Sequence, residues 1–202
     1  MKILSLYSGG GGIDIGFGKN KFKTVLSIEN WDKACLTLKK NNISKNVICE
    51  DIRKVDFNKI KNQFKFDCIV GGPPCPPFSK SRFYLKNKKR ALEDDDSHTL
   101  ANYFLAVEKF KPKVFFFENV HGFIFKPHEA ALRYFEKQSE KLGYSITHKV
   151  INCADYGVPQ IRQRFICVGF KKNLGKFIFP NQTHSNQDNE NNLFSLPWVN
   201  CK

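Results

Sequence analysis

Two features that would place a short chain in a particular class are missing from this sequence. Its seven cysteines are an odd number and include no Cys-x-x-Cys pair, so the sequence favours neither a disulfide framework nor a zinc site. Such scattered cysteines suit a reducing compartment best. No apolar run is long enough to span a bilayer, and Met1 leads directly into a strand-like segment rather than a secretory signal.

Acidic residues are scarce relative to basic ones. The chain has 19 Asp and Glu against 33 Lys and Arg, which gives a formal net charge of +14. A surface this basic attracts polyanions, and nucleic acid is the first candidate. The alternative is a Lys- and Asn-rich composition that makes a soluble protein merely basic. With 202 residues, 41% of them hydrophobic, the chain can bury one full core.

The apolar pattern predicts a chain that alternates strands and helices. Short, continuously apolar runs of the kind found in buried parallel strands recur along the sequence. We expect strands at residues 2–7, 24–29, 46–52, 66–70, 113–117, 145–153 and 160–170. We expect helices near residue 13 and at residues 31–41, 100–110 and 127–142. The polar, Asn-rich residues near the end are typical of a linker, so we place one domain over residues 1–180 and a linker over 181–202.

A glycine-rich turn follows the first expected strand. The run from Ser8 to Gly12 would let a ligand lie against bare backbone amides at the start of a helix. Alone, it fits a nicotinamide-dependent oxidoreductase, a methyltransferase or a flexible loop about equally well. Glu29 ends the second strand, where a carboxylate can hold a ribose diol. Asp51, near the end of the third, could accept a hydrogen bond from an adenine amino group. The alternatives are a solvated acid and a turn former.

A proline-rich loop around Cys75 follows the fourth expected strand. Gly71 and Gly72 let the backbone leave the strand sharply, and four prolines keep the loop out of helix or sheet. A thiol on such a stiffened loop is where a doubly wound α/β protein presents a nucleophile. The alternative is a proline-rich turn with an incidental cysteine.

Two further groups lie at strand ends. Glu118 follows the apolar strand 113–117, where desolvation could keep it protonated as an acid; otherwise it is a structural acid that binds loop amides. Gln160, Arg162 and Arg164 alternate, which predicts one face of the last strand. That face could contact a base carbonyl and phosphates, or it could be a salt-bridged edge strand.

In order and spacing, these motifs resemble those of the cytosine-C5 DNA methyltransferases. The matching residues are Tyr7-Ser8-Gly9-x-Gly11-Gly12, Glu29, Asp51, Pro73-Pro74-Cys75-x-x-Phe78-Ser79, Glu118-Asn119-Val120 and Gln160-x-Arg162-x-Arg164. The resemblance covers residues 2 to about 183. It implies a Rossmann-like α/β fold that binds S-adenosylmethionine, with a seven-stranded, mostly parallel sheet and helices on both faces.

The resemblance also implies a role for each matched position. Cys75 would be the nucleophile, Glu118 the acid facing the base, and Arg162 the residue facing the cytosine carbonyl. The positions expected to bind S-adenosylmethionine are Tyr7, Ser8, Gly9, Gly11, Gly12, Glu29, Asn30, Asp51, Ile52, Gly72, Pro74 and Leu100. Those expected to contact DNA are Ser79, Asn119, Gln160 and Arg164. The resemblance implies no metal.

The implied chemistry explains why these residue types are needed. C5 of cytosine is a poor nucleophile, and addition of the Cys75 thiolate at C6 makes it enamine-like and able to attack a methyl sulfonium. Glu118, donating to N3, would stabilise the charge that develops during addition. The target base must leave the DNA helix to reach this pocket, and basic residues would favour that step through phosphate contacts.

The chain also departs from the family pattern. Asn30 stands where an apolar or aromatic residue often packs on the adenine, and Pro76 stands where Gln is usual. The family's target-recognition region and last cofactor-side motif are absent. We therefore expect part of a split or truncated restriction-modification enzyme that acts on double-stranded DNA in the cytoplasm with a second polypeptide. The alternatives are an inactive cofactor-binding relic or regulatory fragment, and a tRNA cytosine-5 methyltransferase.

Overall fold

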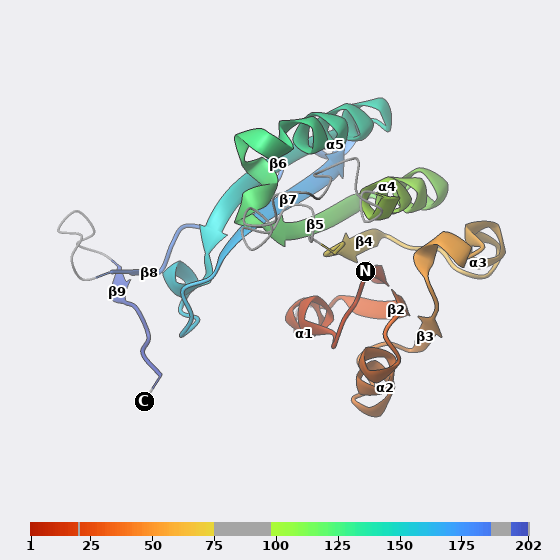
Figure 1. The fold of residues 1–202 in the computed structure, drawn as a ribbon, viewed down its shortest axis with the longest axis horizontal. Helices are drawn as coiled ribbons and strands as arrows, with labels where there is room; N and C mark the ends of the chain where they lie inside the picture. Colours follow the sequence, from red (N-terminus) through yellow and green to blue (C-terminus); the bar gives the residue numbers. More distant parts are fainter. Residues whose placement is uncertain (20, 75–97, 187–194, 202) are drawn as a thin grey trace, which may run out of the picture.

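A seven-stranded sheet forms the centre of the protein, in the order β3-β2-β1-β4-β5-β7-β6 (Figure 1). The computed structural model describes residues 1–19, 21–74, 98–186 and 195–201. The strands are Lys2–Leu6 (β1), Lys23–Glu29 (β2), Asn46–Cys49 (β3), Cys68–Gly71 (β4), Val114–Val120 (β5), Tyr144–Asn152 (β6) and Gln163–Lys171 (β7). β7 pairs antiparallel with β5 and β6, and every other neighbouring pair is parallel. The predicted α/β fold with a mostly parallel sheet is confirmed.

Helices cover the two faces of this sheet unequally. The helices are Gly12–Gly18 (α1), Asp32–Lys40 (α2), Phe57–Gln63 (α3), His98–Phe110 (α4) and Glu129–Lys141 (α5). The strand order reverses direction after β3, and parallel crossovers are right-handed, so α1 and α2 lie on one face and α3, α4 and α5 on the other. Figure 1 shows α1 and α2 on the opposite side of the sheet from α4 and α5.

Successive side chains of β5 point to opposite faces of the sheet, and they contribute to a large hydrophobic core on one face and a small one on the other. Phe115 and Phe117 are fully buried towards α4 and α5, and the Phe117 ring centroid lies 4.6 Å from that of Phe135. The alternate side chain of Phe116 is only partly buried and packs with Phe17 of α1 at 5.3 Å between ring centroids. Because side chains alternate along a strand, Glu118 belongs to the Phe116 face.

Two strands have different bounds from those predicted: one ends earlier and the other begins later. The third stops at Cys49, because Asp51 caps a 3₁₀ turn at Ile52–Lys54 (η1) by accepting from the Arg53 amide at 2.9 Å. The last begins at Gln163, three residues later than expected. Gly157 precedes this start with φ 82°, in the left-handed region that suits glycine. The predicted single strand face of Gln160, Arg162 and Arg164 is therefore wrong, since the first two precede the strand.

The segment after β7 is attached to the rest of the protein by hydrogen bonds to Asp155. The remaining short elements are 3₁₀ turns at His121–Ile124 (η6), Lys126–His128 (η7), Cys153–Tyr156 (η8) and Lys172–Leu174 (η9), and the parallel pair His184–Ser185 (β8) and Leu196–Pro197 (β9). The Asp155 carboxylate accepts from Gln182 Nε2 at 2.9 Å and Trp198 Nε1 at 3.0 Å. Among the described residues, no helix is long and apolar enough to cross a membrane.

Candidate functional site

The candidate residues collect at one edge of the sheet. Leu6 of β1 and Phe117 of β5 both lie opposite Gly71, at the end of the β4 strand between them. The chain leaves β1 into the glycine turn and leaves β4 towards Cys75, while Glu118 follows Phe117. The carboxyl ends of neighbouring parallel strands, where α/β folds bind ligands, thus bring these three segments together.

Glu29 ties the glycine turn to the end of β2. Its Oε2 accepts from the Gly9 amide at 2.7 Å, and its Oε1 accepts from the amides of Asn30 at 2.9 Å and Trp31 at 3.0 Å. Gly11 has φ 89°, and a Cβ there would lie 2.7 Å from the Ile43 side chain, so the turn needs glycine at this position. Since Oε2 has one of these donors and Oε1 has two, Oε2 retains room for a ligand hydroxyl.

A pocket of about 260 Å³ lies beside Glu29. Six of the residues predicted to bind the cofactor line it: Tyr7, Glu29, Asn30, Asp51, Ile52 and Pro74. Four lining residues were not predicted: Ile28, Glu50, Arg53 and Thr99. The predicted residues outside the lining are Ser8, Gly9, Gly11, Gly12, Gly72 and Leu100. Leu100 is 2% exposed in the main core, and the other five lie in the segments that directly follow β1 and β4.

Tyr7 joins the glycine turn to the start of α4. Its backbone has φ 54°, unusual for a residue with a bulky side chain, and its hydroxyl donates to the Thr99 carbonyl at 2.7 Å. Burial, and next the nearby Asp51 charge, raise the pKa of the Tyr7 hydroxyl well above its ordinary value, so it stays a neutral donor. No local sequence signal links residue 7 to residue 99, which is why Thr99 was missed.

Asp51 is already engaged by Arg53. Besides the Arg53 amide, its carboxylate accepts from the Arg53 guanidinium, with Nε 2.9 Å from Oδ2. Hydrogen bonds from the Arg53 side chain and backbone lower the pKa of Asp51 to about 2. Asp51 is therefore ionised at neutral pH, and an adenine amino group would share its oxygens with Arg53.

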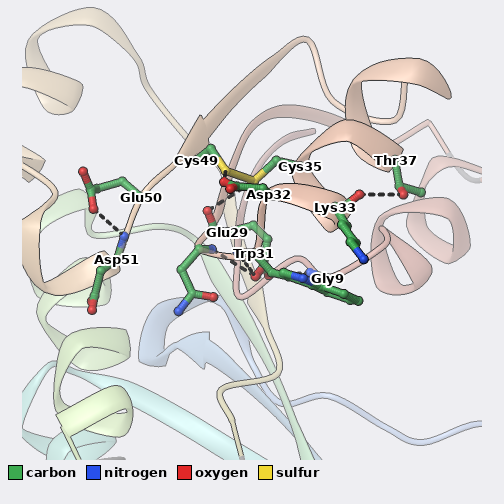
Figure 2. Close-up of a disulfide and its surroundings, with 11 residues drawn as sticks. Gly9, Glu29, Trp31, Asp32, Lys33, Cys35, Thr37, Cys49, Glu50 and Asp51 are labelled. Carbon is green, nitrogen blue, oxygen red and sulfur yellow. Dashed lines mark hydrogen bonds between the residues drawn. A yellow bond between two sulfur atoms is a disulfide. The ribbon is translucent and has the colours of Figure 1, made fainter.

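A disulfide between Cys35 and Cys49 lies directly beside Glu29 (Figure 2). Cys35 belongs to α2 and Cys49 ends β3. The scattered cysteines did not predict this bond. Cys35 Sγ is 3.4 Å from the Glu29 carbonyl oxygen, so the disulfide packs against the backbone of the residue that holds the glycine turn.

Glu118 forms an ion pair with Arg164, with Arg164 Nε 2.8 Å from Glu118 Oε1. The side chains are 26% and 20% exposed, respectively. Burial raises the pKa of the Glu118 carboxyl, while the charges of Arg164 and then Arg162 oppose that rise. The two arginines predicted to face the substrate thus lie unequally: Arg164 contacts the acid, whereas Arg162 is exposed and acts on it through its charge.

Asn119 and Gly72 bring the backbone that follows β4 close to β5. Asn119 is 2% exposed, and its side-chain amide donates to the Pro73 carbonyl at 3.5 Å. A Cβ on Gly72 would lie 3.0 Å from Glu118 Oε2, so glycine lets the backbone pass the acid closely. The structure places Asn119, predicted to contact DNA, in the interior, where it holds the backbone at Pro73.

The remaining predicted residues divide into two groups. Gln160 and Arg162 are exposed beside η8, where the Arg162 amide donates to Asn152 Oδ1 at 2.9 Å. Cys75 and Ser79 lie outside the described residues. Within the described part of the chain, no group of three or more His, Cys, Asp or Glu side chains could hold a metal ion.

Comparison with known proteins decides the family. The model of the C-5 cytosine-specific DNA methylase family matches residues 1–197. The chain belongs to this family of DNA (cytosine-5-)-methyltransferases. Type II methyltransferase M.FnuDI of Fusobacterium nucleatum is 35% identical over 182 residues, which cover 89% of this chain and 50% of that enzyme. M.NgoPII of Neisseria gonorrhoeae is 33% identical, with 98% and 56% covered.

The chain thus spans about half the length of these two methyltransferase relatives. M.AquIA of Picosynechococcus differs: the match is 35% identical and covers 96% of this chain and 82% of that protein. The family therefore includes a curated type II methyltransferase not much longer than this chain.

Solved structures agree on the fold. A candidate DNA modification methyltransferase encoded within an E. coli prophage superposes with a TM-score of 0.74 at 25% identity, covering 89% of this chain and 49% of that chain. Spodoptera frugiperda DNMT2 gives 0.69 at 22% identity, with 90% and 53% covered. The seven-stranded methyltransferase fold implied by the sequence is confirmed.

Proposed function

We propose that this chain is the catalytic half of an enzyme that transfers a methyl group from S-adenosylmethionine to C5 of a flipped-out cytosine in DNA. The observation that carries the proposal is the Glu118–Arg164 ion pair at the sheet edge, 2.8 Å between Nε and Oε1, beside the segment that leads to Cys75. An acid held by a guanidinium, next to the segment that leads to a cysteine, matches the needs of nucleophilic addition to a pyrimidine.

The pocket beside Glu29 fits the adenosine end of S-adenosylmethionine. Glu29 Oε2 can accept from a ribose hydroxyl while it keeps its bond to the Gly9 amide. Ile28 and Ile52 supply apolar walls for a purine ring, and Asp51 is an ionised acceptor near its amino group. The cofactor would supply an electrophilic methyl group, which cytosine C5 attacks once C6 carries a nucleophile.

The residues of this chain would activate the base. The Cys75 thiolate would add to C6, and electron density would move towards C5 and N3. Glu118, whose pKa burial raises, would present a proton to N3 as charge develops there. Arg164 would hold that carboxyl in place, and Arg162 would stabilise charge on the carbonyl side. After methyl transfer, loss of the C5 proton and elimination of Cys75 would release the product.

A second polypeptide would carry target recognition. The chain spans about half of M.FnuDI and M.NgoPII, so those enzymes contain roughly as much protein again. The sheet face that carries α1 also has an apolar hollow of about 420 Å³ over β4, β5 and β7. Its aromatic lining residues are Phe17, Phe22, Phe116, Tyr156, Phe170, Phe177 and Phe179. In a doubly wound fold such a face packs against another layer, and we assign it to a helix of that polypeptide.

The net charge of +14 favours a nucleic-acid substrate, and the DNA methylase family and type II methyltransferase relatives support double-stranded DNA, with the cytoplasm as the proposed place of action. The test is transfer of a tritiated methyl group to duplex DNA and, separately, to tRNA, with the chain alone and with the polypeptide encoded beside it. We expect labelled DNA from the pair, and none with Glu118→Gln at comparable cofactor binding. Label in tRNA but not DNA would contradict the proposed substrate. Cofactor binding without transfer in any pairing would instead indicate an inactive relic.

A further inference from the structure

The Cys35–Cys49 disulfide fastens the edge strand of the sheet to the helix beside it. β3 is four residues long and, among the described strands, lies at the edge of the sheet, where it pairs with β2 and Cys49 lies opposite Glu29. Beyond this ladder, the disulfide is a covalent link from β3 to α2. An edge strand held on one side is a weakly restrained element, so a covalent link there limits its motion.

Both ends of the disulfide lie close to the backbone of Glu29, which lines the pocket. Cys35 Sγ is 3.4 Å from the Glu29 carbonyl oxygen, and the Glu50 amide, next to Cys49, donates to that same carbonyl at 2.9 Å. Asp51 and Ile52 follow and line the pocket wall. The disulfide therefore lies beside both Glu29 and the turn at Glu50 and Asp51 (Figure 2).

The two sulfur atoms differ in accessibility. Cys49 is exposed, whereas Cys35 is 2% exposed, so an incoming thiolate can reach the Cys49 side. Each sulfur has an acceptor close by: Asp32 Oδ1 is 3.2 Å from Cys49 Sγ, and the Glu29 carbonyl serves Cys35. A reduced pair would find hydrogen-bond partners without rearrangement, so the open state is also accommodated.

We propose that Cys35 and Cys49 form a reversible thiol–disulfide exchange site whose closed state tightens the cofactor pocket. The coupling to the cofactor rests on the proposed function, whereas the exchange site itself does not. In a reducing compartment, a disulfide of this kind is typically transient and redox-sensing rather than structural. The closed form adds a covalent tie to the hydrogen bonds that hold the Glu50–Ile52 turn against Glu29, and the open form leaves β3 with those hydrogen bonds and side-chain packing but no covalent link to α2.

The exchange involves two electrons and two protons. A thiolate of a dithiol reductant attacks Cys49 Sγ, the bond between the two cysteines breaks, and Cys35 leaves and takes up a proton. The second thiol of the reductant then attacks the mixed disulfide, which releases Cys49 as a thiol and leaves the reductant as its disulfide. A disulfide oxidant such as oxidised glutathione drives the reverse direction.

The test compares one protein in two redox states. Peptide mass spectrometry after treatment with oxidised glutathione or dithiothreitol follows the Cys35–Cys49 link, and calorimetry measures S-adenosylmethionine binding in each state. We expect affinity to fall about fivefold or more on reduction. Cys35→Ser and Cys49→Ser should bind like the reduced protein in both buffers. Cys201→Ser is the control, because this exposed cysteine lies 3.4 Å from the Pro159 carbonyl, and it should keep the redox difference.

Each failure has a distinct signature. Absence of the linked peptide after oxidation overturns the exchange site. A linked peptide with equal affinity in the two states overturns the coupling to the pocket. A linked peptide with no S-adenosylmethionine binding in either state overturns the proposed cofactor, and the coupling with it, while the exchange site stands.

Discussion

Arg164 and Glu118 meet diagonally across the antiparallel strands β7 and β5. Arg164 lies opposite Val120 and Glu118 lies opposite Ile166, yet Arg164 Nε reaches Glu118 Oε1 at 2.8 Å. Both side chains belong to the face that carries Phe116 and Val168, and they stand at its polar end. The contact to Glu118 therefore depends on where β7 begins. The strand starts at Gln163, so it includes Arg164, whereas Ile161, two residues earlier, is exposed.

Replacing Arg164 should impair methyl transfer more than replacing Arg162. Arg164→Gln removes both the contact to Glu118 and the charge that lowers its pKa, so we expect a loss of about 10²-fold in rate. The pKa of Glu118 should rise further, which moves the high-pH decline of an acid-dependent step to higher pH. Single-turnover transfer across pH, with Arg162→Gln as the matched variant, measures this. Equal losses in the two variants with unshifted profiles would contradict the ion pair's role.

Neutralising Glu118 should change how stability depends on pH. Burial raises the pKa of Glu118, so the protonated carboxyl favours the folded state. That contribution is fully present below the carboxyl's ordinary pKa and is lost as pH rises through the raised value. Glu118→Gln stays neutral at every pH. The unfolding temperature of this variant minus that of the wild type should therefore increase as pH rises from acidic to neutral. Thermal unfolding of both proteins at several pH values measures this difference. A difference that increases on acidification instead would contradict the prediction.

The amide cluster at Glu29 predicts a local loss of stability on substitution. Glu29→Gln replaces an acceptor oxygen with a donor and leaves at least one of three backbone amides unsatisfied. We expect a cost of about 1–3 kcal/mol in the free energy of unfolding and weaker cofactor binding. Glu50→Gln is the stability control, because Glu50 is exposed and its contact with Lys54 is 3.9 Å long. Its Oε1 accepts from one backbone amide, that of Asp51 at 2.9 Å, which the glutamine oxygen can still accept, so the cost should be small. Denaturant unfolding that ranks Glu50→Gln as the costlier change would refute this assignment.

The apolar hollow should bind a hydrophobic dye in the lone chain. Phe177 and Phe179 line it, whereas Ile178 between them is 87% exposed and does not. Phe177→Glu with Phe179→Glu should lower the fluorescence of an anilinonaphthalene sulfonate probe, while Ile178→Glu should leave it unchanged. The polypeptide encoded beside the chain should displace the probe. Equal dye binding by both variants would remove this face as the docking surface.

The sequence predicted most strands to within a few residues because buried strands are continuously apolar. Val114–Val120 and Cys68–Gly71 show this, since both lie where short apolar runs were expected. The ends were less predictable. Asp51 and Arg53 form a local ion pair that closes a 3₁₀ turn, and the alternation of Gln160, Arg162 and Arg164 resembles a strand although the strand begins at Gln163. A hydrogen-bonded turn within three residues decided the first end, whereas at the second the Arg162 amide bonds to Asn152, ten residues away.

The site was predictable in part for a similar reason. Tyr7, Glu29 and Asp51 stand at strand ends, and the fold brings strand ends to one edge. Contacts between segments far apart in sequence left no local signal. The hydrogen bond from Tyr7 to Thr99 spans 92 positions, and the Cys35–Cys49 pair meets only because α2 packs beside β3. Which arginine contacts Glu118 likewise depended on where β7 begins.

The most direct test of the central claim is a covalent trap at Cys75. In duplex DNA containing 5-fluorocytosine, the C5 substituent cannot leave as a cation, so the enzyme should stay bonded to C6 after methyl transfer. The chain is incubated with this DNA, S-adenosylmethionine and the polypeptide encoded beside it, and the adduct is mapped by mass spectrometry. We predict a methylated nucleotide on Cys75 and no adduct with Cys75→Ser. An adduct on another residue, or transfer that survives Cys75→Ser, would contradict the account.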